Sequence, residues 1–436
     1  METISDRKRI FSWAFYDWAN SAFATTVMAG FFPLFFKQYW SAGTAATVST
    51  FQLGAANSTA SIIVAFLAPI LGAIADQGSV RKKFLLYFAA MGIVMTGALP
   101  FVARGNWEAA IALYIFATIG FSGGNIFYDA LIVNVAPKEQ MDSVSALGFA
   151  LGYLGGGLLF ALNITMILTP QTFGLNDASE AVRLSFISVA VWWAIFSIPL
   201  LVFVPEPKNN TPGPRRNPVS AGFQQLKTTF KKVRRLRVVC LFLLGYWLYI
   251  DGLDTIVRMA VDYGMSLGFA SKDLITALLI TQFVGFPAAM AFGWIGEKLG
   301  AKTGIFMGIT VYLGVTLWGF FMQEEWEFYL IAAVIGLVQG GVQSLSRSFY
   351  TRIIPKNQSA EFFGFYNLLG KFAAVIGPLL MGWVGVLTGN ARYSILSISI
   401  LFLCGGALLA FVNEDEGRRL AEQLERSSFD SCTGDS

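Results

Sequence analysis

Ionisable side chains interrupt several long apolar runs of this sequence. Asp251, Asp254 and Arg258 follow one another at intervals of three and four residues, which places them on one face of a helix. Asp17 and Asn20 lie together in another apolar run. A charged group at the centre of a bilayer costs about 2.5–3.5 kcal/mol on insertion scales, so it normally faces a partner or a water-filled cavity. If these runs span a membrane, their polar groups are candidates for binding a solute or carrying a proton.

The composition requires a lipid-facing surface. Of 436 residues, 55% are hydrophobic and 13% are charged, against about 25% charged in an ordinary soluble domain. Long runs such as residues 84–102 are apolar all round, whereas the strands of a membrane barrel would alternate in polarity. The sequence therefore predicts an all-α protein that crosses the membrane many times.

Several classes of chemistry are excluded or disfavoured by residue types. Histidine is absent and there are three cysteines, Cys240, Cys404 and Cys432, which excludes histidine metal sites, histidine proton relays and a disulfide framework. No P-loop and no nucleophile with a histidine base is present. We expect no enzyme activity, no cofactor, no metal and no nucleic-acid partner. The net charge of +4 is read as a sign of membrane topology.

Apolar runs of about 20 residues predict twelve spans. They begin near residues 11, 48, 84, 107, 144, 183, 238, 273, 303, 326, 360 and 392. Most of the 31 Lys and Arg residues fall in the terminal segments and in the loops that follow even-numbered spans. By the positive-inside rule, both termini are expected in the cytoplasm, in what we take to be a bacterial cytoplasmic membrane.

The two halves of the chain resemble each other. Residues 72–83 (GAIADQGSVRKK) follow the second span, and residues 293–302 (GWIGEKLGAK) follow the eighth. Each begins with glycine, has an acid four residues later, and then a glycine and basic residues. We therefore divide the chain into two six-helix bundles, 1–204 and 238–412, a proline-rich and then basic linker, 205–237, and a cytoplasmic tail, 413–436.

These two loops resemble the signature loop of the major facilitator superfamily. The first loop departs from the usual form at Gln77 and the second at Glu297, but both keep the charge pattern. The resemblance covers essentially the whole chain and implies two pseudo-symmetric bundles that rock about a site near the midplane.

A narrower resemblance rests on the first and eleventh spans. Residues 16–23 (YDWANSAF), 361–366 (EFFGFY), 370–371 (GK) and 377–378 (GP) are similar to the family of autophagy-related vacuolar amino-acid effluxers and its bacterial relatives. This implies a secondary active transporter that moves a small polar or zwitterionic solute, an amino acid or a related metabolite, in the direction of efflux. The expected partners are that solute, membrane lipid and a coupling proton, with the protein acting as a monomer.

The superfamily resemblance further implies that spans one, four, seven and ten line a central cavity. Six polar residues could then converge as a substrate site: Asp17, Asn20, Asp251, Asp254, Arg258 and Lys371. Acids and bases held apart in one wet cavity suit a zwitterion. Its carboxylate would meet Lys371 or Arg258. Its ammonium group would meet Asp17 or Asp251, and Asp17 is also the candidate for proton coupling.

Structural pairing is the alternative for part of this set. Asp254 and Arg258 can pair on their own helix, and Lys371 can pair with Asp251. Two other functions also stay open: efflux of amphipathic drugs or metabolites, and a membrane sensor with a transporter fold.

A second group of charges is expected to form a cytoplasmic gate. Asp129 and Arg347 lie at repeat-equivalent places near the cytoplasmic ends of spans four and ten, close to the signature loops with Asp76 and Glu297. We expect Asp129 to meet Arg81 and Arg347 to meet Glu297, as latches that switch conformation without touching substrate.

The fifth span carries a stripe of small residues. Gly148, Gly152 and Gly156 recur every four residues, which favours close helix packing that still permits sliding. The run resembles the antiporter motif of the superfamily, except that Tyr153 stands where that motif has proline.

Overall fold

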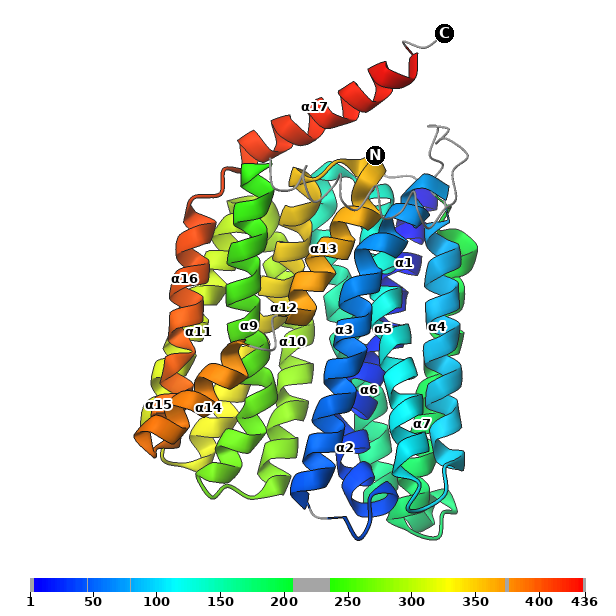
Figure 1. Cartoon of the computed structure of the whole chain (residues 1–436), viewed down its shortest axis with the longest axis vertical. Coiled ribbons are helices and arrows are strands. Elements are labelled where there is room, and N and C mark those ends of the chain that lie inside the picture. The colour runs from blue at the N-terminus through cyan, green and yellow to red at the C-terminus, as the bar shows by residue number, and fades with distance from the viewer. Residues whose placement is uncertain (1–3, 45, 79, 207–235, 373–375, 434–436) are drawn as a thin grey trace.

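The structure is a computed structural model that describes residues 4–44, 46–78, 80–206, 236–372 and 376–433. Its described residues form helices joined by short turns, without strands, which confirms the all-α prediction (Figure 1). The two chain ends lie at the same end of the molecule, which we call the terminus-bearing end. Eleven helices of the described chain are long and apolar enough to cross a membrane.

The first six spans form a group that we call the N bundle. Its first span runs from α1 through π-helical turns and a short α-helix. The elements are α1 (Ile4–Ala22), η1 (Phe23–Phe31), α2 (Phe32–Phe35), η2 (Phe36–Trp40), α3 (Ala46–Gly78), α4 (Arg81–Ala98), η3 (Leu99–Phe101), α5 (Trp107–Val135), η4 (Lys138–Gln140), α6 (Met141–Leu168), η5 (Pro170–Phe173) and α7 (Ala178–Phe203).

The remaining spans form the C bundle. The predicted eleventh span covers α13 and α14, on either side of residues 373–375, which lie outside the described set, and the twelfth is divided between α15 and α16. The elements are α9 (Arg237–Ser266), α10 (Ser271–Leu299), α11 (Ala301–Phe321), α12 (Glu325–Ile353), η6 (Lys356–Gln358), α13 (Ser359–Phe372), α14 (Ile376–Thr388), α15 (Ala391–Ser397) and α16 (Ser399–Ala410). The tail is a further helix, α17 (Glu414–Thr433), at the terminus-bearing end (Figure 1).

Local sequence signals explain many of the helix boundaries. The side chains of Asn106 and Asp177 accept backbone N–H groups at the starts of α5 and α7, and Glu324 forms a capping box at the start of α12. Gly300 has φ of 87°, a conformation that favours glycine, and it separates α10 from α11 without a longer loop.

Basic residues of the signature loops tie the third span of each bundle to its sixth. Lys82 Nζ at the start of α4 donates to the carbonyls of Leu201, at 2.9 Å, and Val204 at the end of α7. Lys302 Nζ at the start of α11 donates to the carbonyls of Ala410 and Val412, at 2.9 and 2.8 Å, at the end of α16. A cation at a helix C-terminus satisfies carbonyls that lack a partner within the helix.

The same pairs of spans are tied at the opposite end. Arg183 Nε at the start of α7 donates to the carbonyl of Pro100, at 2.9 Å, and Arg392 Nη1 at the start of α15 donates to that of Phe320, at 2.8 Å. The internal repeat seen in the sequence is therefore a repeat of contacts as well as of helices.

The two bundles meet along two helix pairs, α6 with α10 and α3 with α13. Glycines allow the close approach. A Cβ atom on Gly72 of α3 would lie 2.4 Å from the carbonyl oxygen of Ala360 on α13, and one on Gly296 of α10 would lie 2.9 Å from Asp142 Cβ on α6. Since both glycines belong to the signature loops and their preceding turns, these loops mark where the bundles touch at the terminus-bearing end.

Candidate substrate and gating site

One arginine from the C bundle is shared by two acids from the N bundle. Arg347 Nη1 on α12 lies 3.0 Å from Asp129 Oδ1 on α5 and 3.8 Å from Asp17 Oδ2 on α1. The Arg347 side chain is 3% exposed, against 12% for Asp129 and 14% for Asp17. A buried charge that loses its partner is costly, so this ion pair favours the conformation in which the bundles are closed here.

The guanidinium group of Arg347 is also fixed by neutral contacts. Nε donates to Ser145 Oγ at 2.9 Å, and Nη2 donates to the Ser145 carbonyl at 2.7 Å. The rings of Phe149, Trp13 and Tyr128 lie 4.4, 5.0 and 5.5 Å from its central carbon, within the range of cation–π attraction. Every one of these partners belongs to the N bundle, so Arg347 is a C-bundle cation held in an N-bundle pocket.

A glycine of the small-residue stripe makes room for this arrangement. A Cβ atom on Gly148 would lie 2.7 Å from the Tyr128 hydroxyl, 3.0 Å from Arg347 Nη2 and 3.2 Å from Asp17 Oδ2. The Tyr128 hydroxyl in turn donates to Asp17 Oδ2 at 3.3 Å. The stripe therefore serves the charge network as well as helix packing.

The expected gate pairs are corrected in one respect. The pairing of Arg347 with Glu297 is wrong: Arg347 reaches across to Asp129, whereas Glu297 is exposed at the terminus-bearing end. The two repeat-equivalent residues thus pair with each other across the bundle interface, with the acid on α5 and the base on α12. Arg81 Nη1 donates to Asn134 Oδ1 at 2.9 Å, and its pairing with Asp129 stays a prediction.

The two polar residues of the first span have different environments. Asp17 faces the bundle interface through Arg347. Asn20 is 1% exposed and donates through Nδ2 to Asn125 Oδ1 at 2.5 Å, within the N bundle. Asn20 therefore has an amide partner of its own bundle in this conformation, and its contact with substrate stays a prediction.

Asp251 has a role that the sequence did not predict. Its Oδ1 accepts the N–H of Gly377 at 2.9 Å and its Oδ2 accepts that of Ile376 at 3.0 Å, while Thr255 Oγ1 donates to Oδ1 at 3.3 Å. Ile376 is the first residue of α14. Asp251 thus satisfies two backbone N–H groups of α14 inside the C bundle, where an unpaired N–H group would be costly. The expected contact of Asp251 with an ammonium group stays a prediction.

Three expected site residues have side chains outside the described set: Asp76, Arg258 and Lys371. The backbone places Arg258 on α9 with Asp251 and Asp254, and Lys371 near the end of α13, before the start of α14. Asp254 is partly buried. Their roles in substrate contact or gating stay predictions.

A second ion pair crosses the interface nearer the terminus-bearing end. Arg352 Nη2 on α12 lies 2.5 Å from Asp142 Oδ2 on α6, and Arg352 Nη1 lies 3.2 Å from Glu414 Oε1 on α17. Asp142 is fully buried and also accepts from Ser348. Sequence reasoning missed this pair, although a signal was present: an acid follows a Pro-Lys-x-Gln run at both repeat positions, as Asp142 and as Glu361.

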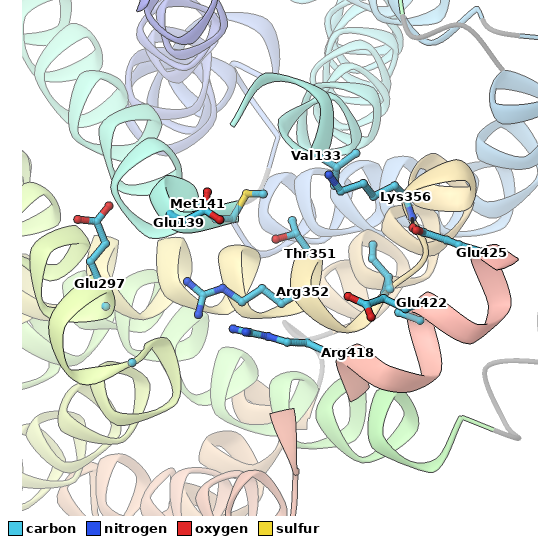
Figure 2. Close-up of a pocket in the computed structure, with 14 residues that line it drawn as sticks. Val133, Glu139, Met141, Glu297, Thr351, Arg352, Lys356, Arg418, Glu422 and Glu425 are labelled. Carbon is cyan, nitrogen blue, oxygen red and sulfur yellow. Dashed lines mark hydrogen bonds between the residues drawn. The ribbon is translucent and has the colours of Figure 1, made fainter. Parts of the chain in front are cut away.

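A cavity of about 490 Å³ opens beside this pair, between the two bundles and α17 (Figure 2). Its lining includes Glu139 from the N bundle, Glu297 and Lys356 from the C bundle, and Glu422 from α17. Figure 2 shows the guanidinium groups of Arg352 and Arg418 side by side, pointing the same way into the cavity. Because three parts of the chain form its walls, the cavity exists only while the bundles are closed at this end.

Comparison with solved structures identifies the fold. The human organic anion transporter MFSD10 matches with a TM-score of 0.71 at 15% identity, over 94% of this chain and all of the other. The proton:xylose symporter XylE matches with a TM-score of 0.69 at 13% identity, over 95% of this chain and 96% of the other. Both have the major facilitator fold, so the twelve-helix prediction is confirmed.

Sequence comparison identifies relatives along most of the chain. MFS-type transporter YxiO of Bacillus subtilis is 39% identical over 414 residues, which cover 94% of this chain and 96% of YxiO. Autophagy-related protein 22 of Yarrowia lipolytica is 25% identical over 440 residues, which cover 80% of this chain and 73% of that protein. The family model described as vacuole effluxer Atg22 like matches residues 40–136 and 133–422. This chain is therefore an integral, multi-pass membrane protein that belongs to the Atg22-like family of major facilitator transporters.

Proposed function

We propose that this transporter is coupled to protons and moves a small polar or zwitterionic solute, an amino acid or a related metabolite, in the direction of efflux. The observation that carries the proposal is the sharing of Arg347 by Asp17 and Asp129 across the bundle interface. Asp17 and Asp129 share this one guanidinium group. A proton or an ammonium group could replace it beside Asp17, and either would change how strongly the bundles attract each other.

Asp17 is the acid of the pair that is better placed to exchange its partner. Its distance to Arg347 Nη1 is 3.8 Å, against 3.0 Å for Asp129, and its side chain is 14% exposed. When Asp17 takes a proton, Asp129 still neutralises Arg347, so the closed interface keeps one balanced pair. Protonation of Asp17 is thus a change that the network tolerates, which is what a coupling residue requires.

The substrate class follows from the charges that remain available. With Asp251 engaged at the start of α14, Asp17 is the proposed partner of the ammonium group. Lys371 and Arg258 are the proposed partners of the carboxylate. The direction of efflux is proposed from the family description, vacuole effluxer Atg22 like, which names movement out of a compartment. We place both termini in the cytoplasm, on the basis of the Lys and Arg distribution.

Purified protein in proteoliposomes tests this proposal. A thermal-shift screen of the twenty amino acids, small peptides and organic anions would first identify a stabilising solute. With that solute radiolabelled, Asp17→Asn should lose accumulation driven by a pH gradient and keep solute exchange without a gradient. The matched control is Asp177→Asn, outside the spans, because asparagine also caps a helix well.

Each of the other outcomes points to a different function. Gradient-driven accumulation that persists in Asp17→Asn would remove Asp17 from coupling. Stabilisation by amphipathic cations in place of amino acids would indicate drug or metabolite efflux. Binding of a solute without any flux would indicate a sensor.

A further inference from the structure

An aromatic ring of the N bundle is seated inside the C bundle. Tyr153 on α6 lies between Gly285 on α10 and Gly340 on α12. A Cβ atom on Gly285 would lie 3.0 Å from Tyr153 Cδ1 and Cγ, and one on Gly340 would lie 2.6 Å from Tyr153 Cε2. Tyr153 is 9% exposed. The two glycines form a socket that no other residue type would leave open.

All three residues lie at the middle of their helices. Tyr153 is the thirteenth of the 28 residues of α6, Gly285 the fifteenth of the 29 of α10, and Gly340 the sixteenth of the 29 of α12. The contact is therefore near the midplane of the molecule. The ion pairs of Arg347 and Arg352 lie nearer the terminus-bearing end of α12.

The middle of a helix pair and its ends move by different amounts when two bundles rock. When two rigid bundles rock, the ends move most and the contact on the rotation axis moves least. Ion pairs near an end must therefore break in each cycle, whereas a contact on the axis can persist. A flat ring against two glycine backbones suits such a contact, because it keeps dispersion contacts while it tilts and meets no Cβ atom.

We propose that Tyr153, seated between Gly285 and Gly340, is the fulcrum on which the two bundles turn. It is a positioning residue: its ring fixes the axis, and its hydroxyl makes no hydrogen bond within the described part of the chain. The proposal goes beyond the proposed function, because it requires the bundles to turn but does not depend on which solute or ion they carry.

The test measures bundle motion without a substrate. In a chain with Cys240, Cys404 and Cys432 replaced by serine, spin labels at Ala103→Cys and Gln323→Cys report the distance between the bundles at the end opposite the termini. Both sites are exposed, one in each bundle. In lipid nanodiscs at acidic and neutral pH, the otherwise unchanged chain should show two distance populations.

A side chain added at Gly340 should shift the balance between the two distance populations. Gly340→Ala should change the ratio of the two populations at least tenfold, and Tyr153→Ala in the same chain should restore it. Tyr153→Phe, which keeps the ring, should leave the ratio unchanged. The control is Gly314→Ala on α11, where an added Cβ meets no atom within 4 Å.

Folding is checked by size exclusion in each variant. If Gly340→Ala does not fold, Gly285→Ala replaces it, because the three atoms nearest its added Cβ all belong to Tyr153. Unchanged populations in the folded glycine variant would overturn the proposal. Loss of one of the two distance populations in Tyr153→Phe would also overturn it, because the role would then belong to the hydroxyl. A single population in the unchanged chain would overturn it as well, because the bundles would then not turn. Since no solute is added, none of these results depends on the proposed substrate.

Discussion

Asp17 and Asp251 both lie in the first span of a bundle, yet they have different kinds of partner. Each stands in the first span of its bundle, three residues before a second polar residue. Asp17 shares Arg347 with Asp129, and that arginine belongs to the other bundle. Asp251 accepts two backbone N–H groups from α14, which belongs to its own bundle.

The difference teaches which buried acids can take part in switching. A contact within one rigid bundle is kept when the bundles rock, whereas a contact between bundles is made and broken. Depth in the membrane is therefore not enough to mark an acid as functional. By this criterion Asp17, Asp129 and Asp142 belong to the moving interface, and Asp251 belongs to the framework of the C bundle.

The largest expected effect is at Arg347. Arg347→Met removes the buried cation that Asp17 and Asp129 share. Removing one partner of a buried ion pair costs about 3–5 kcal/mol. We expect a large fall in thermal stability in detergent and loss of transport. Arg104→Met, at an exposed loop position, is the control and should change neither.

A neutral network separates stability from switching. Arg347→Met combined with Asp17→Asn and Asp129→Asn removes all three charges, and such replacements are often neutral for stability. The combined variant should recover most of the lost stability and still fail to transport. Full transport in that variant would show that the shared arginine is structural.

The second effect is at Asp251. Asp251 accepts the N–H groups of Ile376 and Gly377 through two different carboxylate oxygens, and Asp251→Asn keeps only one acceptor oxygen. One of the two N–H groups then loses its acceptor. A buried donor left without a partner costs about 1–3 kcal/mol, and we expect the unfolding free energy to fall by that amount. Thermal unfolding with and without lipid measures it.

The comparison of the two acids depends on what Asp251→Asn leaves intact. Flux driven by a pH gradient should persist in Asp251→Asn, in proportion to the folded protein, and be lost in Asp17→Asn. The opposite pattern, with coupling lost at position 251 and kept at position 17, would contradict the assignment of Asp251 to the framework. Thr255→Val, which removes one weaker hydrogen bond to the same carboxylate, should have a smaller effect on stability.

The third effect is at the outer ion pair. In Asp142→Asn, Arg352 loses its N-bundle partner and keeps Glu414 on α17. The closed state should become less favourable by about 1 kcal/mol, which raises the open fraction roughly fivefold. Ala146→Cys reports this opening, because Ala146 faces Gly293 across the interface and is 1% exposed. Its labelling rate from the terminus-bearing side should rise accordingly in a background without other cysteines.

A control keeps this result specific to the interface. Glu139→Gln lies on the same side, three residues before Asp142, and its side chain is exposed. It should leave the labelling rate of Ala146→Cys unchanged. Equal rates in Asp142→Asn and in the unchanged background would show that the outer pair does not hold the bundles closed.

The sequence was sufficient for the fold. Apolar runs, signature loops and the repeat predicted twelve helices in two bundles, and the gate residues Asp129 and Arg347 were found in the network. Partners could not be predicted, because a repeat gives equivalent positions and does not say which bundle supplies the opposite charge. Arg347 was expected to meet Glu297 of its own half and meets Asp129 of the other.

The contact of Asp251 with α14 was missed for a related reason. Its donors, Ile376 and Gly377, come more than a hundred residues later in the chain, and the repeat gives no sign that they approach Asp251. The tail helix α17 was missed because its residues are polar and its apolar face is short. Gly417 packs against Ile353 and Val238, a contact that only the folded C bundle provides.

The smallest expected effect is at Glu414, where α17 meets the interface. Glu414 shares Arg352 with Asp142, but its side chain is 22% exposed, and exposed ion pairs contribute about 0.2–1 kcal/mol. Glu414→Gln should therefore raise the labelling rate of Ala146→Cys less than Asp142→Asn does. The control is Glu416→Gln, exposed in the same helical turn, which should leave that rate unchanged. The reason is that α17 packs on α12 and α9 and moves with the C bundle, so only Asp142 lies across the gap. An effect of Glu414→Gln as large as that of Asp142→Asn would mean that α17 orients Arg352 and is itself part of the gate.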